Sequence, residues 1–478
     1  MPHRRTLPNR LIEFCLLAVC FSLTVTSAAA EAGWKAGTAA AMITPEKPMW
    51  MAGYGHRDKP SEGALHPLWI KVLALEDAGG RRAIVLSSDL LGVPQSVYRH
   101  TVHALKEQFG LEPSQIVLTA SHTHCGPVLR GALYDVYPLD DQQKTLIETY
   151  SVELEAKIVQ SVGEALSKLA PARLHAGQGI TRFAVNRRNN LEPDVSKLRE
   201  SNALQGPVDH SVPVLTVTAP AGELRAVLFG YACHNTTLSF YQWCGDYAGF
   251  AQIALQRSHP GAVALFFMGC GADQNPLPRR EVALAERYGQ MLAAAVEEVL
   301  LQNPAPVEPK LRTSLEMVTL NLGAQPTSEE LQKMTIGQTN YLSRWAARLL
   351  DQSKSGQPFI RTYPYPVQVW KLGDRQLWIT LGGEVVVDYA LRFKQEYGAE
   401  VWVAGYCNDV MAYIPSARVL KEDVPPVASG RWGYEGNTSM YVYGLPAHRW
   451  ADDIEELIAA SVQRLVHRVK ATEQQGGE

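Results

Sequence analysis

Three features are missing from this chain of 478 residues beyond its first 30. No later stretch is long and apolar enough to cross a bilayer, so no membrane-spanning segment is expected there. No basic run occurs and the formal net charge is −3, which argues against nucleic acid as a partner. No internal repeat or low-complexity tract is present either. The composition, with 46% hydrophobic and 19% charged residues, is that of a folded globular protein.

The first 30 residues have the pattern of a secretion signal. Three arginines precede an apolar stretch that ends in small residues, which provide a cleavage site after Ala30. A retained membrane anchor is the alternative, but the interrupted apolar stretch and its small-residue end favour cleavage. We therefore expect an exported protein, periplasmic or extracellular, with a signal peptide over residues 1–30 and a mature chain over residues 31–478.

Cysteine is scarce, and its number in the mature chain is odd. Cys15 and Cys20 lie in the predicted signal peptide, so five cysteines remain after cleavage. An exported chain can pair some of them, but at least one thiol stays unpaired within the chain. Their spacing is not that of a zinc ribbon or finger, which favours buried thiols or one disulfide over thiolate ligation of a metal. The five are Cys125, Cys233, Cys244, Cys270 and Cys407.

Apolar strands and 3.6-residue helical periodicity alternate along the mature chain, with two hairpins among the strands. This mixture favours an α/β fold with mixed β-sheets and flanking helices, in a single large catalytic domain. Strands are expected at residues 68–76, 83–88, 116–120, 214–217, 224–232, 262–268, 367–371, 377–381 and 401–405, and helices at 95–109, 141–169, 280–302, 328–350, 386–397 and 450–470.

A His-Thr-His-Cys segment follows the apolar strand at 116–120 and precedes a Gly-Pro stop. Residues two apart in a strand share one face, so His122 and His124 can direct two imidazoles toward one point. Imidazole is a frequent ligand of catalytic transition metals. A lone histidine is more often structural, but this pair indicates a metal site.

Other polar residues also follow apolar strands, where α/β sheets collect their functional sites. A hydrolytic zinc ion needs three or four N or O ligands and one open position, and two histidines with a carboxylate are a common set. His122, His234 and Glu384 can supply this set from three separate strands.

These segments resemble the catalytic domain of the neutral, non-lysosomal ceramidase family. The family motif His-Thr-His-Ser-Gly-Pro matches residues 122–127, with a cysteine at the serine position, and Asn-Ile-Asn-Arg matches residues 184–187. Further motifs follow in the same order, so that the resemblance extends from about residue 37 to residue 443. The remaining matched segments are 208–210, 232–237, 245–251 and 434–439.

The resemblance implies a single zinc ion held by two histidines, a glutamate and a tyrosine, which are His122, His234, Glu384 and Tyr413 here. The family segment has two tyrosines, and Val or Met stands at the earlier place in this chain. Tyr413 is therefore the first candidate, and Tyr406 is a weaker one.

Roles for neighbouring residues follow from the implied zinc site. Zinc would lower the pKa of a water molecule toward about 7 and polarise the scissile carbonyl. His124 is the natural proton shuttle near neutral pH. Arg187 could hold a carbonyl oxygen or a developing oxyanion. Asp246 could orient a ligand histidine, although capping of a loop is an equal alternative.

Two departures from the family pattern matter. A serine that is important for activity in the family falls where this chain has Gln274 or Asn275. An amide can donate a hydrogen bond to an oxyanion, so Gln274 remains a catalytic candidate, but it cannot act as a nucleophile. The chain also ends at Glu478 in a predicted helix, so we expect no C-terminal immunoglobulin-like domain of the kind that ceramidases carry.

Three hypotheses follow. The first is an exported zinc amidohydrolase that cleaves an N-acyl amide of a ceramide-like lipid, which allows peripheral contact with a membrane. The second is a zinc esterase or deacylase with another small-molecule substrate, and the third is a non-catalytic exported binding protein of the same fold. Apolar residues at 49–51 and Tyr54 could line an acyl channel, although core packing is favoured. The sequence does not indicate an oligomeric state.

Overall fold

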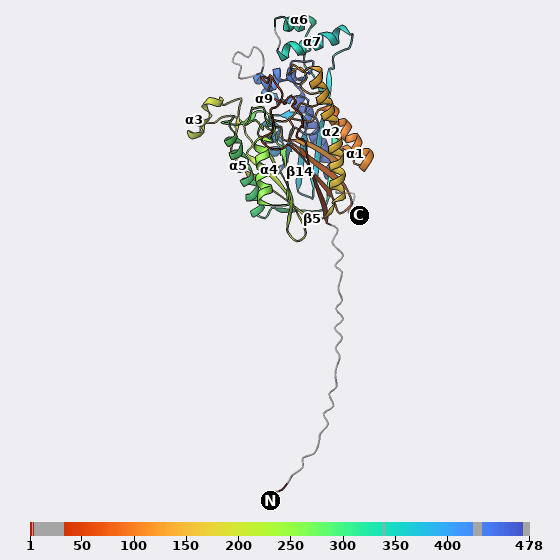
Figure 1. The fold of residues 1–478 in the computed structure, drawn as a ribbon, viewed down its shortest axis with the longest axis vertical. Coiled ribbons are helices and arrows are strands. Elements are labelled where there is room, and N and C mark those ends of the chain that lie inside the picture. Colours follow the sequence, from red (N-terminus) through yellow and green to blue (C-terminus); the bar gives the residue numbers. More distant parts are fainter. Residues whose placement is uncertain (2, 4–32, 338–339, 424–432, 472–478) are drawn as a thin grey trace. The chain divides into compact units, whose positions relative to one another are not determined.

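The computed structural model describes Met1, His3 and residues 33–337, 340–423 and 433–471 (Figure 1). The predicted signal peptide falls almost wholly on residues 2 and 4–32, outside the described residues, so its cleavage stays a prediction. Gly33–Glu478 forms one compact unit. It has the predicted α/β architecture of mixed sheets with flanking helices. Over the described residues, no helix combines the length and the apolar character that a membrane crossing requires.

Among the described residues, the larger sheet contains nine strands in the order β4-β3-β2-β1-β5-β7-β8-β9, with β11 beside β5. It is antiparallel in its middle, and the parallel pairs β3–β4 and β8–β9 lie at its ends. The strands are β1 (Trp34–Met42), β2 (Trp69–Glu76), β3 (Arg82–Ser88), β4 (Ile116–Ala120), β5 (Ala170–Ile180), β7 (Ser211–Thr218), β8 (Leu224–Tyr231), β9 (Val263–Met268) and β11 (Ala305–Val307).

The larger sheet curls so that its two ends meet. The Ser87 hydroxyl on β3 donates to the carbonyl of Phe266 on β9 and accepts the Phe266 N–H at 3.2 Å. Lys71 on β2 donates to the carbonyl of Ala264 at 2.9 Å. The curl brings the loop after β4 close to the loops after β8 and β9, which carry the polar motifs.

A smaller sheet packs face to face on the larger one. Its order is β12-β13-β14-β16, and the core between the two sheets is rich in aromatic residues. Trp378 stands at its centre, with ring centroids 5.1 Å from Phe267 of the larger sheet and 5.6 Å from Trp370. The strands are β12 (Leu311–Asn321), β13 (Thr362–Leu372), β14 (Gln376–Leu381) and β16 (Trp402–Ala404).

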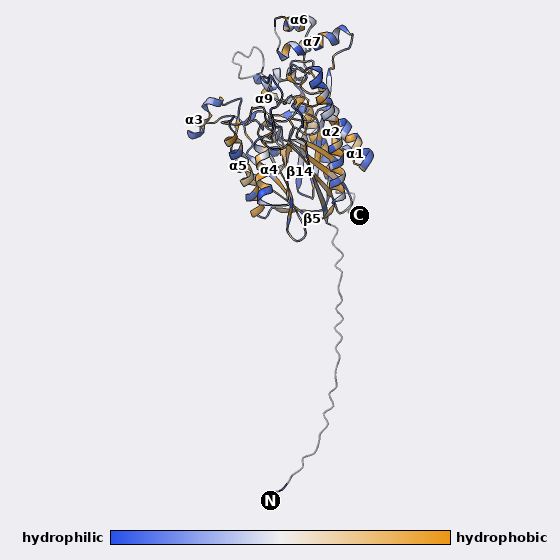
Figure 2. Cartoon of the chain, viewed as in Figure 1, coloured by the Kyte–Doolittle hydropathy of each residue, from blue (hydrophilic) through white to orange (hydrophobic). Residues whose placement is uncertain are grey.

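Helices cover the outer faces of both sheets and bury their apolar sides against the strands. Figure 2 shows hydrophobic colouring on the central strands and hydrophilic stretches on the surrounding helices. Helices α1 and α2 cover one part of the larger sheet, α4 and α5 another part, and α8 and α11 cover the smaller sheet. Their bounds are α1 (Gln95–Phe109), α2 (Asp141–Ser167), α4 (Asp246–Ser258), α5 (Val282–Leu301), α8 (Val387–Tyr397) and α11 (Ile454–Ala471).

The helix predicted over residues 328–350 is wrong as a single element. The structure has two helices there, α6 (Ser328–Thr335) and α7 (Tyr341–Lys354). Gly337 has φ +70°, a left-handed conformation that ends a helix, and the Asn340 side chain caps the next one by accepting the Ser343 N–H at 3.1 Å. A third short helix, α3 (Val195–Glu200), precedes β7.

The closing helix also begins later than predicted, at Ile454 rather than at residue 450. Trp450 instead lies in an isolated bridge with Leu322. Its indole N–H donates to the Tyr413 carbonyl at 2.8 Å, so this buried ring supports a candidate ligand.

Candidate metal centre and active site

His122 stands just past the end of β4. Its φ of +57° is left-handed, which turns the chain sharply after the strand. Its Nδ1 lies 2.6 Å from the Leu91 carbonyl, and because a carbonyl only accepts, Nδ1 carries the proton. In the neutral ring, Nε2 then presents a lone pair. The Asn408 side chain fixes the strand behind it by accepting the Leu118 N–H at 3.0 Å.

His234 follows β8 and is oriented in the same way. Its Nδ1 lies 3.0 Å from the Gly271 carbonyl, so its Nε2 also presents a lone pair in the neutral ring. Its backbone N–H donates to the Gln274 carbonyl at 2.8 Å, which ties it to the start of the short strand β10 (Gln274–Pro276).

Glu384 and Tyr413 reach the centre from a separate two-stranded sheet. They face each other in a short parallel pair of strands, β15 (Glu384–Val385) and β17 (Tyr413–Ile414). Glu384 follows β14, and Tyr413 follows β16. The left-handed Gly383, with φ +69°, makes the turn between β14 and Glu384.

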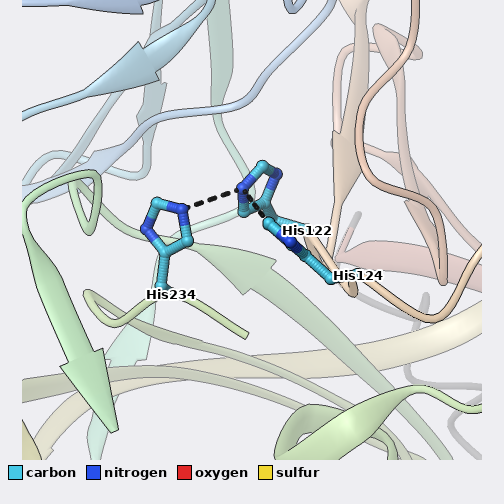
Figure 3. A group of neighbouring side chains, drawn as sticks. All are labelled: His122, His124 and His234. Atoms are coloured by element: carbon cyan, nitrogen blue, oxygen red, sulfur yellow. Dashed lines mark hydrogen bonds between the residues drawn. The ribbon is translucent and has the colours of Figure 1, made fainter. Parts of the chain in front are cut away.

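The four side chains converge on one point. Nε2 of His122 and Nε2 of His234 are 3.2 Å apart, and Figure 3 shows the two nitrogens directed toward each other. Oε2 of Glu384 lies 3.1 Å from His122 Nε2 and 3.2 Å from His234 Nε2. The Tyr413 hydroxyl lies 3.3 Å from His234 Nε2.

These residues fit a metal ion. Two lone pairs and a carboxylate oxygen face one another, and Glu384 Oε2 is buried without a hydrogen-bond donor among the described residues. Zinc bonds of about 2.0–2.1 Å in tetrahedral geometry place neighbouring ligand atoms roughly 3.3 Å apart, close to the observed spacings. A cation at their centre would satisfy all of these acceptors, whereas without one they repel each other.

His124 completes a cluster of three histidines in Figure 3. Its Nε2 lies 3.2 Å from His122 Nε2, and the candidate ligand atoms of the three rings lie within 4.8 Å of one another. His124 is 8% exposed, compared with 1% for His122 and for His234. Its Nδ1 has no hydrogen-bond partner among the described residues. It can therefore act as a further metal ligand or exchange protons beside the metal.

Burial and mutual proximity determine the charge state of this cluster. Burial, together with the charge of Arg187, lowers the pKa of His234 to about 4, so this imidazole is neutral near pH 7. Burial and the two other histidines lower the pKa of His124 far below its ordinary range. For Glu384, burial acts to raise the pKa, and positive charge on or hydrogen bonds from His122 and His234, in the states in which their Nε2 atoms carry a proton, lower it well below its usual value.

Arg187 lies beside the candidate metal ligands. It follows strand β6 (Ala184–Asn186), which pairs with β10 (Gln274–Pro276). One guanidinium nitrogen donates to the Tyr413 hydroxyl at 3.3 Å, and Nε donates to Glu435 at 2.8 Å. Its side chain is 20% exposed, so it can meet a group that arrives from solvent.

Gln274 is placed differently from the other candidates. Its amide nitrogen donates to the carbonyls of Ala232 and Cys270, and its amide oxygen accepts the Asp209 N–H at 3.0 Å. The side chain is wholly buried, and its amide forms hydrogen bonds with backbone groups. The structure therefore does not bring it to the ligand cluster. The neighbouring Asn275 instead accepts from Arg187 at 3.5 Å.

The two remaining candidates from the sequence, Asp246 and Tyr406, make contacts that support the structure around the centre. Asp246 accepts the backbone N–H groups of Leu238 and Tyr247 at 2.8 and 2.6 Å, which is the loop-capping alternative rather than contact with a histidine. Tyr406, the weaker ligand candidate, packs its ring on His122 with centroids 4.4 Å apart.

The apolar loop near the N-terminus packs in the core, as the favoured alternative predicted. Met49, Trp50 and Met51 are at most 5% exposed and belong to the cluster under α1 and α2. Tyr54 packs its ring edge against His124, with centroids 4.6 Å apart, and donates its hydroxyl to the Leu238 carbonyl at 3.0 Å. This loop therefore forms a wall beside the histidines.

Two residues that lie beside the centre, Tyr443 and Glu435, were not predicted from the sequence. The Tyr443 hydroxyl donates to Oε1 of Glu384, the carboxylate oxygen that the histidines leave free. Glu435 accepts from Arg187 and also from Arg188, at 2.6 Å. Glu435 lies in the matched segment 434–439, which was a signal for it, whereas nothing in the pattern around Tyr443 indicated its contact.

Comparison with known proteins agrees with this geometry. Residues 34–266 match the family model for the neutral/alkaline non-lysosomal ceramidase, N-terminal. A neutral ceramidase of Pseudomonas aeruginosa is 27% identical over 234 residues, which is 47% of this chain and 33% of that protein. Neutral ceramidase A of Dictyostelium discoideum is 24% identical over 243 residues, 49% of this chain and 33% of the relative. The matches thus span about a third of the length of these curated relatives.

Solved structures extend the likeness of the fold to most of the chain. The crystal structure of neutral ceramidase from Pseudomonas aeruginosa gives a TM-score of 0.67 at 19% identity and covers 93% of this chain and 75% of that one. A ceramidase complexed with C2 gives a TM-score of 0.64 at 18% identity, over 91% of this chain and 76% of the other.

Fold and site together define a class: an α/β domain of two stacked mixed sheets with a buried histidine and carboxylate centre between their strand ends. Residues 34–266 match the model of the neutral/alkaline non-lysosomal ceramidase family, so the resemblance read from the motifs is confirmed.

Proposed function

We propose that this chain is a zinc-dependent hydrolase that cleaves the N-acyl amide bond of a ceramide-like lipid. The observation that carries the proposal is the convergence of His122 and His234 with Glu384 at spacings of 3.1–3.2 Å, with Tyr413 at 3.3 Å from His234. The match of residues 34–266 to the ceramidase family model supports the choice of reaction, since the relatives described above bear the name neutral ceramidase.

His122, His234, Glu384 and Tyr413 would hold the metal. A zinc ion supplies Lewis acidity and makes a nucleophile of water near neutral pH. His124, held beside the ligands and neutral near pH 7, accepts a proton during attack and returns it to the leaving amine nitrogen. Arg187 directs its guanidinium toward the carbonyl oxygen, where negative charge develops.

The exposure of the residues around the cluster supports one direction of substrate entry. The four candidate ligands are at most 3% exposed, whereas the Arg187 side chain is 20% and Tyr434 is 39% exposed. The rings of Tyr413 and Tyr434 both lie 5.7 Å from the Arg187 guanidinium. An amide that enters past Tyr434 would therefore meet Arg187 before it reaches the metal.

A second candidate, a zinc esterase or deacylase with another substrate, is favoured by one observation. The segment that carries a serine in the family has Gln274 here, and its amide is engaged with backbone groups. Position 274 therefore offers a substrate neither the hydroxyl of the family serine nor a free amide. The contacts that select ceramide in the family can differ in this chain.

The test compares hydrolysis of a fluorogenic ceramide with that of short N-acyl amides and of matched esters by zinc-loaded protein. Ceramide turnover that stops on chelation and returns with zinc is expected. Turnover of esters without ceramide supports the second candidate. Protein that binds no metal and turns over none of the substrates is a binding protein of the same fold and contradicts both.

Export is part of the proposal, with residues 31–478 as the mature hydrolase domain. The arginines and apolar stretch of the first 30 residues support it. The intact mass of protein recovered from the exported fraction tests it. Loss of the first 30 residues is expected, and a full-length mass would contradict cleavage after Ala30.

A further inference from the structure

Two of the five cysteines that follow residue 30 lie against each other beside the histidine cluster. Cys125 comes directly after His124, and Cys244 lies in the loop that leads from His234 to α4. The two residues are 0% exposed and belong to the same hydrophobic cluster. The Cys244 and Cys125 thiols interact with each other, and the Cys125 thiol also lies 3.9 Å from the Leu238 carbonyl.

The backbones around these thiols are joined on both sides. The Cys244 N–H donates to the Cys125 carbonyl at 3.3 Å. The Thr123 hydroxyl donates to the Cys244 carbonyl at 2.7 Å and accepts the Cys125 N–H at 3.1 Å. A disulfide requires Cα atoms roughly 4.4–6.8 Å apart, and these main-chain and Thr123 contacts hold the two cysteines next to each other.

We propose that Cys125 and Cys244 form a disulfide when the protein folds in an oxidising environment. The two thiols lose two protons and two electrons and form one S–S bond. An oxidising disulfide, carried by an exported thiol–disulfide oxidoreductase or by glutathione, takes up both and becomes two thiols. Because both residues are wholly buried in the folded chain, the bond forms during folding, as the two segments come together.

The bond would join the segments that carry two of the histidines. It closes a long loop between β4 and α4, and it fixes the turn that holds His122 and His124 to the loop after His234. The other cysteines have different surroundings; the Cys407 thiol, for example, donates to the Gly405 carbonyl at 3.2 Å. This inference does not depend on the hydrolase activity, because the bond concerns only the chain itself.

Peptide mapping tests the proposal on the full chain recovered from an exporting host. The protein is unfolded without reductant, free thiols are alkylated, and the digest is analysed by mass spectrometry. A linked pair of peptides that contain Cys125 and Cys244 is expected, with alkyl groups on Cys233, Cys270 and Cys407. The intact mass should rise by about 2 Da on reduction, for the two hydrogens gained.

Two variants sharpen the test. Refolding with glutathione and its disulfide should restore the linked peptides in wild type and in Cys407→Ser, but Cys125→Ser should leave Cys244 alkylated. Full alkylation of Cys125 and Cys244 in the wild type overturns the proposal, and so does a bond from either one to another cysteine. The wild-type map decides the matter even where a variant fails to fold.

Discussion

Glu384 and Tyr413 are direct partners in the register of a two-residue parallel ladder. The Glu384 N–H donates to the carbonyl of Ala412 at 2.8 Å, so the backbone fixes their relative height. A parallel register gives both side chains the same face, and the histidines meet them there from the larger sheet. The distance between carboxylate and phenol is thus set by main-chain hydrogen bonds rather than by flexible side chains.

The histidine pair should control metal content. The double variant His122→Ala/His234→Ala removes two of four candidate ligands, and we expect bound zinc to fall from about one equivalent to near zero. Elemental analysis of purified protein measures this. His259→Ala is the matched control, because His259 lies outside the cluster. Its Nε2 pairs with the Glu297 carboxylate at 3.0 Å. Stoichiometric zinc in the double variant would mean that other residues hold the metal.

Tyr443 should support Glu384 through its hydroxyl alone. Tyr443→Phe deletes the donor to Oε1 and keeps the ring, and loss of such an outer partner of a metal ligand typically costs about 10–100-fold in affinity or activity. Zinc affinity by competition with a chelator and kcat/KM both report the effect. Tyr441→Phe, whose hydroxyl contacts His448, serves as control. Equal zinc affinity and activity in both variants would show that this contact does not orient Glu384.

Gly53 should be essential for the position of His124. A Cβ at Gly53 would lie 2.4 Å from the His124 ring, and φ there is +104°. We expect Gly53→Ala to displace His124 and to reduce kcat by at least about tenfold, the effect of losing a general base or acid. Gly55→Ala is the control, since its Cβ would meet only Val136 at 3.8 Å. If Gly53→Ala retains full activity, His124 does not transfer protons in its present position.

Glu435 and Glu422 bind the same arginine with different burial. Glu435 is 3% exposed and accepts from Arg188 and Arg187, whereas the Glu422 side chain is 30% exposed. Loss of one partner from a fully buried pair costs roughly 3–5 kcal/mol, whereas loss of the partly exposed Glu422 costs less, because water reaches it and Asp423 still pairs with Arg188. We expect Glu435→Gln to lower the free energy of unfolding far more than Glu422→Gln. Denaturant titration measures both, and equal losses would contradict the argument.

Asp409 should make stability fall as pH rises through the acid range. Burial raises its pKa to about 7, even though Tyr363 and Gln95 donate to it. Between about pH 4 and 7 the unfolded state releases this proton while the folded state keeps it, so the unfolded state binds fewer protons and stability decreases. Above about pH 7, the stability that the raised pKa of Asp409 contributes at lower pH is fully lost.

Asp409→Asn removes this titration. Relative to wild type, the free energy of unfolding of the variant should therefore rise from about pH 4 to pH 7, by up to about 4 kcal/mol. Urea titrations at several pH values measure the difference. The exposed Asp351→Asn should leave the pH dependence unchanged. A constant difference between Asp409→Asn and wild type across this range would contradict the raised pKa.

Sequence patterns predicted the strands with continuous β-branched or leucine-rich runs, such as β3, β4 and β14. They missed β1 and β5, because alanine and glycine dominate those strands and their pairing partners come from distant segments. Helix α4 was missed because its buried glycine and alanine faces give weak periodicity.

In the candidate site, too, residues with a local sequence pattern could be predicted, whereas contacts between distant segments could not. His122 and His234 could be found because polar residues stood out after apolar strands. The contact between Tyr443 and Glu384 joins residues 59 positions apart and leaves no local pattern. The engagement of Gln274 with backbone carbonyls likewise depends on the fold, since side-chain direction within a loop is not fixed by residue type.

Two of the proposed ligands, His122 and His234, lie just past strands of the larger sheet, and the other two lie in the separate pair β15–β17. A metal ion held by all four would bind the folded chain and not the separated sheets, so its binding free energy adds to the free energy of unfolding by mass action. Each tenfold rise in free zinc above the dissociation constant then contributes about 1.4 kcal/mol. The melting temperature of this protein would thus report the zinc concentration around it. A chelator would destabilise the folded chain only by lowering the concentration of free zinc.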